Sequence, residues 1–272
     1  GSTTRTRSNR MRSTITLLGA ACAALLVAAP SLAAQDFHWT GHLAAGKRLE
    51  IKGVNGAIRA MATTGDQIDV SARKTAHRSD PDEVEIKVVP FEDGVAICAV
   101  YPTPRRARRE NSCEPGDDWS SSTDNNDVQV DFTIKLPAGI NFDGRTVNGD
   151  LQADNLGADA DVSTVNGSVD VSAAGHVEAT TVNGSIRAAM GRSDWESVAR
   201  FTTVNGGITL TLPANLNAEV RAETVNGDLE TDFPLTVTGK FGPRHLRGTI
   251  GSGGRSLELR TVNGSIQLRK AS

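Results

Sequence analysis

The stretch STVNGSVDV, residues 163–171, decides the fold, because its central tetrapeptide Thr-Val-Asn-Gly recurs along the chain. Val-Asn-Gly occurs seven times in the 272 residues, and six of the seven copies carry Thr in front. From the second copy onward, the copies follow one another at 17 to 37 residues, mostly near 20. A short motif at such a spacing is typical of stacked repeat architectures.

The residues on either side of each motif alternate between apolar and polar. Before Asn263, Leu257 and Leu259 share one parity, and after it Ile266 and Leu268 share the other. Alternation with a period of two over such short runs indicates half-buried β-strands rather than helices. The sequence therefore predicts an all-β chain of short strands that meet at Asn-Gly.

The change of parity at the motif is compatible with two geometries. In the first, Asn-Gly is the two-residue type I′ turn of a β-hairpin, the chain is a set of stacked β-hairpins, and the motif Val points outward. In the second, the motif is a corner of a β-solenoid, a stack like the parallel β-helix. Thr and Val then both point inward, and Asn takes the left-handed conformation that it tolerates better than most residues.

We favour the β-solenoid. Hairpins would leave a row of valines on an outer face that needs another layer to cover it. A solenoid would bury those valines and stack identical asparagines about 4.8 Å apart. An aromatic content of only 4% also suits a narrow stacked core. The motif asparagines are therefore predicted to be structural corners: Asn55, Asn148, Asn166, Asn183, Asn205, Asn226 and Asn263.

Residues 1–34 have the features of a secretory signal peptide. Four arginines precede the apolar run 15–29, and the small residues of 30–34 suit cleavage by a signal peptidase. A membrane anchor is the alternative, but the run is short for a span and rich in Ala. Met11 is an alternative first residue of the protein, in which case residues 1–10 would not belong to the natural chain.

Removal of residues 1–34 would leave an acidic protein. The 29 basic residues would become 25 against 32 acidic ones, which changes the net charge from −3 to −7. This balance disfavours general binding to nucleic-acid backbones. No second apolar span follows, so we expect an exported protein, periplasmic, secreted or on the cell surface, with no transmembrane span in the mature chain. The remaining cysteines, Cys98 and Cys113, predict a disulfide in an oxidising compartment.

The chain divides into three predicted regions. The signal peptide of 1–34 is followed by an N-terminal β region of 35–139, which caps the stack, and by the repeat solenoid of 140–272. A stacked array needs a cap because an exposed last strand invites edge-to-edge pairing. Within the N-terminal region, residues 101–126 form a polar insert without periodicity, which predicts a loop.

Four aspartates, Asp150, Asp154, Asp159 and Asp161, lie within one predicted coil. Parallel β-helix enzymes that act on polysaccharides bind Ca²⁺ through such acids. We favour the simpler interpretation, in which these acids face outward and keep the surface soluble. The sequence shows no motif of a nucleophilic serine or of a phosphate-binding loop. No catalytic residue, cofactor or metal site is therefore predicted.

Three stretches in a fixed order resemble a bacterial family of adhesin-like proteins built on a domain of unknown function. They are LEIKGVNGAIRA at 49–60, VDFTIKLPAG at 130–139 and GTIGSGGRSLELRTVNGSIQLR at 248–269. The resemblance covers residues 37–272 and implies a β-solenoid exported to the cell envelope. It supplies no catalytic residues, and the insert of 101–126 departs from the family pattern.

These observations favour an exported, non-enzymatic envelope protein with an adhesin-like binding role or a structural one. Its expected partner is an unknown envelope protein or glycan, and not a nucleic acid. A polysaccharide-acting β-helix enzyme is the first alternative, which a cleft lined by the aspartates with a nearby Arg or Lys would favour. A periplasmic partner in envelope-stress signalling is the second.

Overall fold

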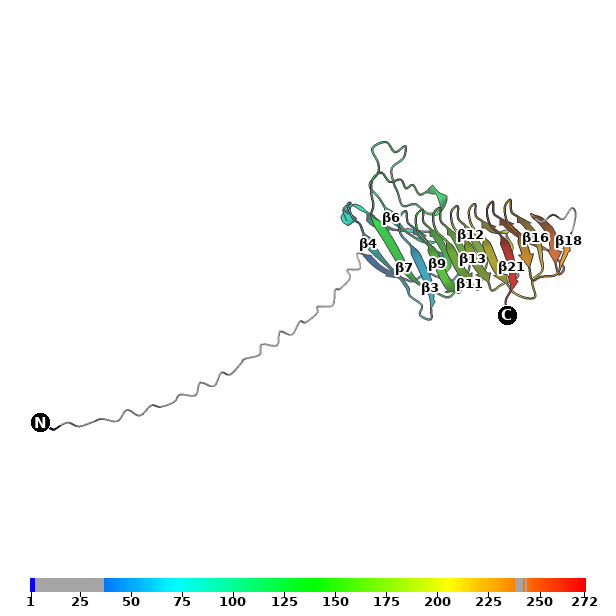
Figure 1. Cartoon of the computed structure of the whole chain (residues 1–272), viewed down its shortest axis with the longest axis horizontal. Coiled ribbons are helices and arrows are strands. Elements are labelled where there is room, and N and C mark those ends of the chain that lie inside the picture. The colour runs from blue at the N-terminus through cyan, green and yellow to red at the C-terminus, as the bar shows by residue number, and fades with distance from the viewer. Residues whose placement is uncertain (3–36, 238–241, 243) are drawn as a thin grey trace. The chain divides into compact units, whose positions relative to one another are not determined.

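The computed structural model describes residues 1–2, 37–237, 242 and 244–272, so almost all of the predicted signal peptide lies outside the described residues. The described residues from Phe37 onward form one compact unit. The unit consists of two sheets of 10 and 11 strands, whose strands follow one another along the stack (Figure 1). No helix in the described part of the chain has the length and apolar character needed to cross a membrane.

The strands are named here in their spatial order, in which neighbours are hydrogen-bonded. Sheet A is β1 (Phe37–Gly41), β4 (Ile68–Thr75), β7 (Gln129–Pro137), β3 (Ile58–Thr63), β9 (Leu151–Leu156), β11 (Val169–Ala173), β13 (Ile186–Met190), β15 (Ile208–Leu212), β21 (Ile266–Lys270) and β17 (Leu229–Thr231). Sheet B is β18 (Leu235–Val237), β19 (His245–Ile250), β16 (Ala218–Glu223), β20 (Arg255–Arg260), β14 (Ala199–Thr202), β12 (Val177–Thr180), β10 (Ala160–Ser163), β8 (Asn141–Arg145), β2 (Arg48–Lys52), β6 (Gly94–Val100) and β5 (Glu85–Phe91). The two 3₁₀ turns described are η1 (Pro81–Glu83) and η2 (Gly116–Asp118).

Each motif connects the two sheets. The strand before it belongs to sheet B and the strand after it to sheet A, as β10 and β11 do on either side of Asn166. In the middle of the stack the neighbours are parallel: β10 pairs with β8 and β12, and β11 pairs with β9 and β13. The predicted solenoid-like stack is therefore confirmed, and the alternative of stacked hairpins is wrong.

The core lies between the two sheets and consists of the inward residues of each alternating strand. Val169, Val171 and Ala173 of β11 are buried, and so are Ala160 and Val162 of β10. Side chains of this size let the two sheets approach closely, and burial of a valine stabilises the fold by roughly 1.5–3 kcal/mol. The alternation read from the sequence thus separates the core face from the outer face.

Five of the seven motif valines are exposed, which corrects our prediction for the solenoid corner, whereas Val54 is buried and Val147 is partly buried. Thr181 is 1% exposed, whereas Val165 is 38% exposed and Val225 52%. The prediction of a left-handed asparagine is also wrong. Among the described residues other than glycine, positive φ angles occur at Asn125 and Asn155, and neither belongs to a motif. The reason for both differences lies in the hydrogen bonds of the corner.

The inward Thr is held by the carbonyl of the motif Gly in the neighbouring coil. Thr181 Oγ1 donates to the Gly167 carbonyl at 2.8 Å, and the same bond recurs at every other Thr-containing copy at 2.8 to 3.1 Å. A buried hydroxyl needs such a partner. Because this bond fixes Thr inside, the adjacent Val must occupy the outer side of the corner.

Asn and Gly complete the corner. Asn166 Nδ2 donates to Asn148 Oδ1 at 2.7 Å, and Asn183 Nδ2 donates to Asn166 Oδ1 at 2.8 Å, so the amides form a ladder along the stack. A Cβ atom on Gly167 would overlap the carbonyl oxygen of Gly149 in the neighbouring coil. The glycine is therefore required by the close approach of two backbones.

The order of the copies in the chain differs from their order in the stack. Asn263 bridges Asn205 on one side and Asn226 on the other. Correspondingly, β21 lies between β15 and β17, and β20 lies between β14 and β16. The last coil of the chain is thus inserted between two earlier ones.

Antiparallel strands occupy both ends of the stack. At the N-terminal end β4 pairs antiparallel with β7, and β5 with β6. At the other end β19 pairs antiparallel with β16, and β18 with β19. We propose that these strands cap the parallel stack and prevent edge-to-edge association.

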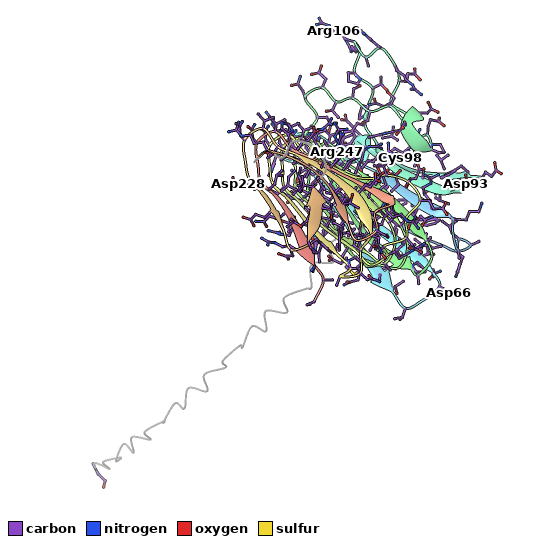
Figure 2. The ribbon with its side chains drawn as sticks, turned by 90° about the vertical axis from the view of Figure 1, so that its right-hand side faces the viewer. Asp66, Asp93, Cys98, Arg106, Asp228 and Arg247 are labelled. Atoms are coloured by element: carbon purple, nitrogen blue, oxygen red, sulfur yellow. A yellow bond between two sulfur atoms is a disulfide. The ribbon has the colours of Figure 1, made fainter. Side chains whose placement is uncertain are left out.

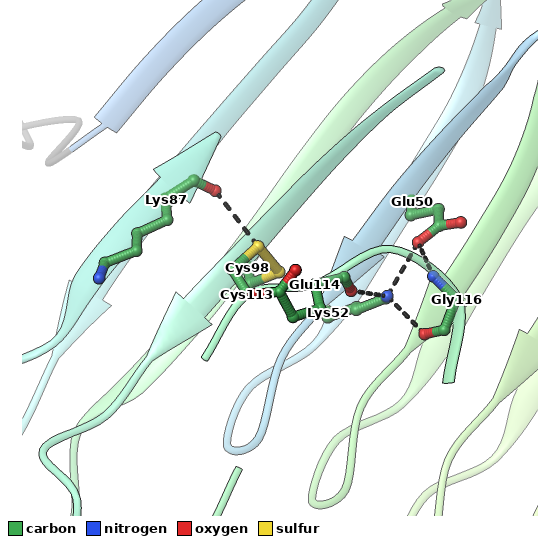
Figure 3. The surroundings of a disulfide bond; sticks show 7 residues. All are labelled: Glu50, Lys52, Lys87, Cys98, Cys113, Glu114 and Gly116. Atoms are coloured by element: carbon green, nitrogen blue, oxygen red, sulfur yellow. Dashed lines mark hydrogen bonds and ion pairs between the residues drawn. A yellow bond between two sulfur atoms is a disulfide. The ribbon is translucent and has the colours of Figure 1, made fainter. Parts of the chain in front are cut away.

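The insert of 101–126 extends from one side of the stack, and its second half lies across sheet B (Figure 1). A disulfide joins Cys113 to Cys98 of β6, with Cα atoms 5.6 Å apart, which is the predicted pairing (Figure 3). Lys52 of β2 is fully buried and donates to the carbonyls of Glu114 and Gly116 at 2.6 and 2.7 Å. The insert is therefore fastened to two neighbouring strands.

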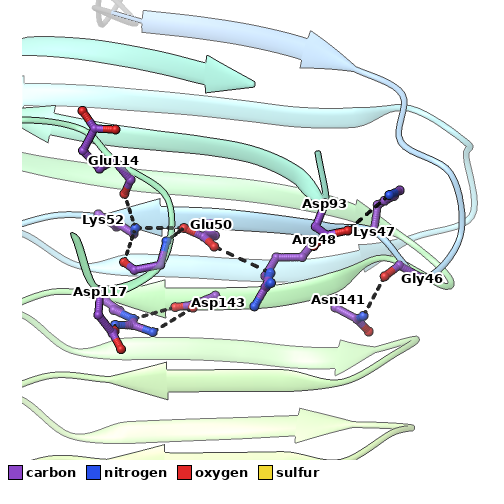
Figure 4. A network of polar contacts seen from close by, with 12 residues as sticks. Gly46, Lys47, Arg48, Glu50, Lys52, Asp93, Glu114, Asp117, Asn141 and Asp143 are labelled. Carbon is purple, nitrogen blue, oxygen red and sulfur yellow. Dashed lines mark hydrogen bonds and ion pairs between the residues drawn. The ribbon is translucent and has the colours of Figure 1, made fainter. Parts of the chain in front are cut away.

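Lys52 also forms a buried ion pair with Glu50 of the same strand. Its Nζ lies 2.8 Å from Glu50 Oε2, which in turn accepts a hydrogen bond from the Gly116 amide at 2.9 Å (Figure 4). Glu50 is only 1% exposed. Removal of one member of such a pair leaves a buried charge without a partner, which typically costs about 3–5 kcal/mol.

The asparagine ladder generates a stability prediction. Asn166→Ala removes one donated and one accepted amide hydrogen bond, so we expect the free energy of unfolding to fall by about 1–2 kcal/mol in urea titrations. The control is Gln152→Ala, which removes an exposed amide that donates to Asp154 on the same strand. If Asn166→Ala unfolded like the wild type and yet lost a ligand, the structural role of the corner would be wrong.

The buried ion pair generates a second prediction. Lys52→Met should lower the free energy of unfolding by about 3–5 kcal/mol and release the insert, because Glu50 loses its buried counterion and keeps only the half-exposed Arg48 at 3.6 Å. Tryptic cleavage at the arginines of 105–109 reports the release. Lys87→Met is the matched control, since Lys87 pairs with Glu85 on the exposed surface. Equal behaviour of the two variants would contradict the fastening role of Lys52.

Candidate functional site

The outer face of sheet B carries a column of charged side chains in register. Glu50 lies opposite Asp143, Asp143 opposite Asp161, and Asp161 opposite Glu178. Neighbouring strands are about 4.8 Å apart, so four carboxylates follow one another at that spacing. Beyond Glu178 the column continues through the remaining strands with Arg200, Glu258, Arg221 and Arg247.

Three acids of this column, Asp143, Asp161 and Glu178, line a hollow of about 390 Å³, to which Arg48 and Asp159 also contribute. Most of its acids have partners. Asp143 accepts from Arg145 at 2.9 and 3.0 Å, and Glu178 lies 3.2 Å from His176 Nε2. Asp159 Oδ1 accepts from the backbone amide of His176 at 2.8 Å.

Asp161 differs from these acids, because it makes no hydrogen bond or ion pair with any residue that the structure describes. The surrounding strands desolvate its carboxylate and the Asp143 charge adds to the effect, which together raise its pKa to about 6. The side chain is nevertheless accessible from the hollow. A carboxyl group that is partly protonated near neutral pH can donate as well as accept a proton.

The structure separates the four aspartates that the sequence places in one coil. Asp159 and Asp161 line the hollow on sheet B. Asp150 lies beside sheet A, where its Oδ1 accepts from the Ser168 amide at 2.8 Å, and Asp154 of β9 accepts from Gln152. Among the described residues, no group of three or more His, Cys, Asp or Glu is arranged to hold a metal ion.

The other predicted residues lie outside this hollow. The seven motif asparagines form the row of corners, where isolated bridges link each one to its neighbours. Cys98 and Cys113 form the disulfide under the insert. These residues shape the stack that presents the charged column.

Sequence reasoning missed the column, although the repeat contains a signal for it. Each member of the column on a strand that precedes a motif stands five residues before the motif asparagine. These residues are Glu50, Asp143, Asp161, Glu178, Arg200, Arg221 and Glu258. Alignment of the copies on their asparagines would therefore have placed them in one row.

The solved structures that are similar to this chain include two described as adhesion proteins. One, described as "a putative cell adhesion protein" from Clostridium sporogenes, is 13% identical, with a TM-score of 0.44, and the match covers 86% of this chain and 99% of that one. The other, described as "a putative adhesin" from Bacteroides fragilis, is 10% identical, with a TM-score of 0.25, and the match covers 87% of this chain and 98% of that one. A search of curated proteins found no match.

A comparison with protein-family profiles identifies the family of this chain. The profile of the family described as Toastrack DUF4097 matches residues 117–269, which is more than half of the chain. The match spans the run from η2 to β21 and includes six of the seven motif copies. The chain belongs to the Toastrack DUF4097 family.

Proposed function

We propose that the protein is an exported, non-enzymatic envelope protein with an adhesin-like role, and that it binds an envelope protein or glycan through the outer face of sheet B. The charged column across that face is the observation that carries the proposal. Its side chains stand on a rigid parallel stack, which suits them to bind without rearrangement.

The arrangement of charge favours an extended partner. The accessible part of the column begins with Asp161 and Glu178 and ends with a majority of arginines, so its two ends attract groups of opposite charge. Electrostatic complementarity of this kind fixes the register and orientation of a partner more than its affinity. A polymer or an elongated protein would contact many of these positions at one strand spacing.

Two features support export. The disulfide between Cys98 and Cys113 is buried at the base of the insert. Disulfides persist in oxidising compartments such as the periplasm or the extracellular space. The sequence of residues 1–34, with its arginines and apolar run, agrees with such a destination.

A second candidate function rests on Asp161. A hollow with a carboxyl group of pKa about 6 beside other carboxyl groups of the column resembles the pairing that glycoside hydrolysis uses. Arg48 lies in the same hollow, as expected for a polysaccharide-acting enzyme. This observation makes hydrolysis of a glycan the alternative to simple binding.

Cosedimentation with isolated envelope fragments tests the binding proposal. We expect the full chain to sediment with the fragments. The double variant Glu178→Gln/Arg200→Gln should bind them at least about tenfold more weakly, because two charges of the column are lost. The control is Arg59→Gln with Asp170→Asn, whose residues lie on the outer face of sheet A.

Pretreatment of the fragments separates the partners. Loss of binding after periodate oxidation indicates a glycan, and loss after proteolysis indicates an envelope protein, including a partner in envelope-stress signalling. No cosedimentation, or equal binding by the column variant and the control, would contradict the proposal.

Asp161→Asn distinguishes the second candidate. Because folding raises the pKa of Asp161, ionisation of this group opposes folding as the pH rises from about 4 to 6. The variant should therefore be more stable than the wild type at pH 7.5, by less than about 1 kcal/mol because solvent screens an accessible charge. The difference should vanish near pH 4 in thermal unfolding, and a difference independent of pH would contradict the assignment.

The same variant reports on catalysis. Release of reducing ends from envelope polysaccharide by the wild type, abolished in Asp161→Asn, would replace binding by hydrolysis as the function. Asp170→Asn, on sheet A, serves as the control for both measurements.

A further inference from the structure

We propose that a second hollow on sheet B, at the opposite end of the column, binds the carboxylate of a uronic-acid residue in an acidic glycan through Arg221 and Arg247. This proposal deepens the binding function proposed above and rests on it. The two arginines belong to β16 and β19, close to the end of the stack. Figure 2 shows the molecule from that end and labels Arg247.

The register places two like charges side by side. Arg221 lies directly opposite Arg247 in the antiparallel pair. Like charges in this position destabilise a sheet. Arg221 uses its Nε to bond Glu223 Oε1 at 3.0 Å, and Arg247 makes no hydrogen bond or ion pair with any described residue. The two guanidinium groups thus keep N–H donors for an anion between them.

A hollow of about 340 Å³ lies at these arginines. Thr249 and Ser256 add hydroxyl groups to its wall. The planar fork of a guanidinium matches a carboxylate with two parallel hydrogen bonds. One carboxylate that accepts from both arginines would remove the repulsion between them.

The binding surface is larger than one carboxylate needs. An adjoining hollow of about 130 Å³ shares Arg221 and Glu258 with the first, and Arg200 and Arg260 line it. A chain of at least two sugar residues can therefore lie across β20 and β16. The second sugar would meet a mixed set of donors and acceptors.

The two glutamates of the first hollow favour a sugar over an acidic peptide. Glu219 and Glu258 line it together with the arginines, and Glu258 is held by Arg200 at 3.3 Å. Their carboxylates can accept hydrogen bonds from sugar hydroxyls. They would repel the closely repeated carboxylates of an acidic peptide. In an acidic glycan each uronic-acid residue carries one carboxylate beside several hydroxyls, so the arginines can bind the carboxylate while the glutamates accept from the hydroxyls.

Isothermal titration of the full chain at low ionic strength tests this site. The probes are tetragalacturonate and tetraguluronate, with the methyl ester of tetragalacturonate and tetraglutamate as comparisons. We expect one or both uronate probes to bind, and the methyl ester and the peptide to bind at least about tenfold more weakly. The ester keeps the hydroxyls but lacks the charge, so it isolates the contribution of the carboxylate.

Arg247→Gln supplies the site-specific test. The variant should weaken uronate binding at least about tenfold, and its melting temperature should stay unchanged or rise because the opposed charge is gone. Arg59→Gln is the matched control. Arg59 is an exposed arginine on sheet A without a hydrogen bond or ion pair to the described residues, and its loss should leave binding unchanged.

Three outcomes would overturn the proposal: neither uronate binds, tetraglutamate binds as well as a uronate, or Arg247→Gln binds like the wild type. These outcomes differ from failure of the proposed function. A chain that sediments with envelope fragments through its column, while Arg247→Gln binds uronate normally, keeps its binding function and loses only this site.

Discussion

The hydrogen bond from a motif threonine to the glycine carbonyl of the neighbouring coil is the interaction on which the rest of the structure depends. It recurs at 2.8 to 3.1 Å at six corners and draws each coil onto the next. The contact requires a motif glycine in the coil that donates the bond, since a Cβ there would overlap the carbonyl oxygen that accepts from the threonine. The asparagine ladder adds a second row of bonds at the same spacing. Together these contacts make the corners identical, and identical corners keep the parallel strands in register.

The uniform corner also explains how the chain presents its charges. A residue at a fixed distance before each motif falls at the same height on every strand of sheet B. The position five residues before the asparagine is occupied by acids at one end and mostly by arginines at the other, from Glu50 to Arg221. The scaffold therefore places functional side chains in a column without any contribution from loops. The insert covers the first of these positions, because Lys52 and the disulfide hold it over Glu50 (Figures 3 and 4).

Much of the fold could be predicted from the repeat, and the failures have specific causes. Alternation and spacing indicate an all-β stack, and two cysteines suffice to indicate one disulfide. Apolar preference predicts a buried Val165, but the hydroxyl of Thr164 takes the inward position because its hydrogen bond across the coils requires it. A stack predicted from the order of the copies in the chain would put the last coil at the end. No local sequence feature shows that Asn263 lies between Asn205 and Asn226. The aspartates from 150 to 161 are close in sequence, yet the turn between β9 and β10 sends them to different sheets.

The free energy of unfolding of Gly167→Ala, compared with Gly65→Ala, tests most directly whether the close contact between corners holds the stack together. Gly65 lies in an exposed turn, where an added Cβ meets no atom closer than 3.8 Å. At Gly167 the added Cβ would overlap the Gly149 carbonyl oxygen, force these two coils apart and break the bond that Thr164 donates to that carbonyl. The account predicts a loss of about 2–3 kcal/mol for Gly167→Ala in urea titrations and a change within about 0.5 kcal/mol for Gly65→Ala. Equal stability of the two variants would contradict it.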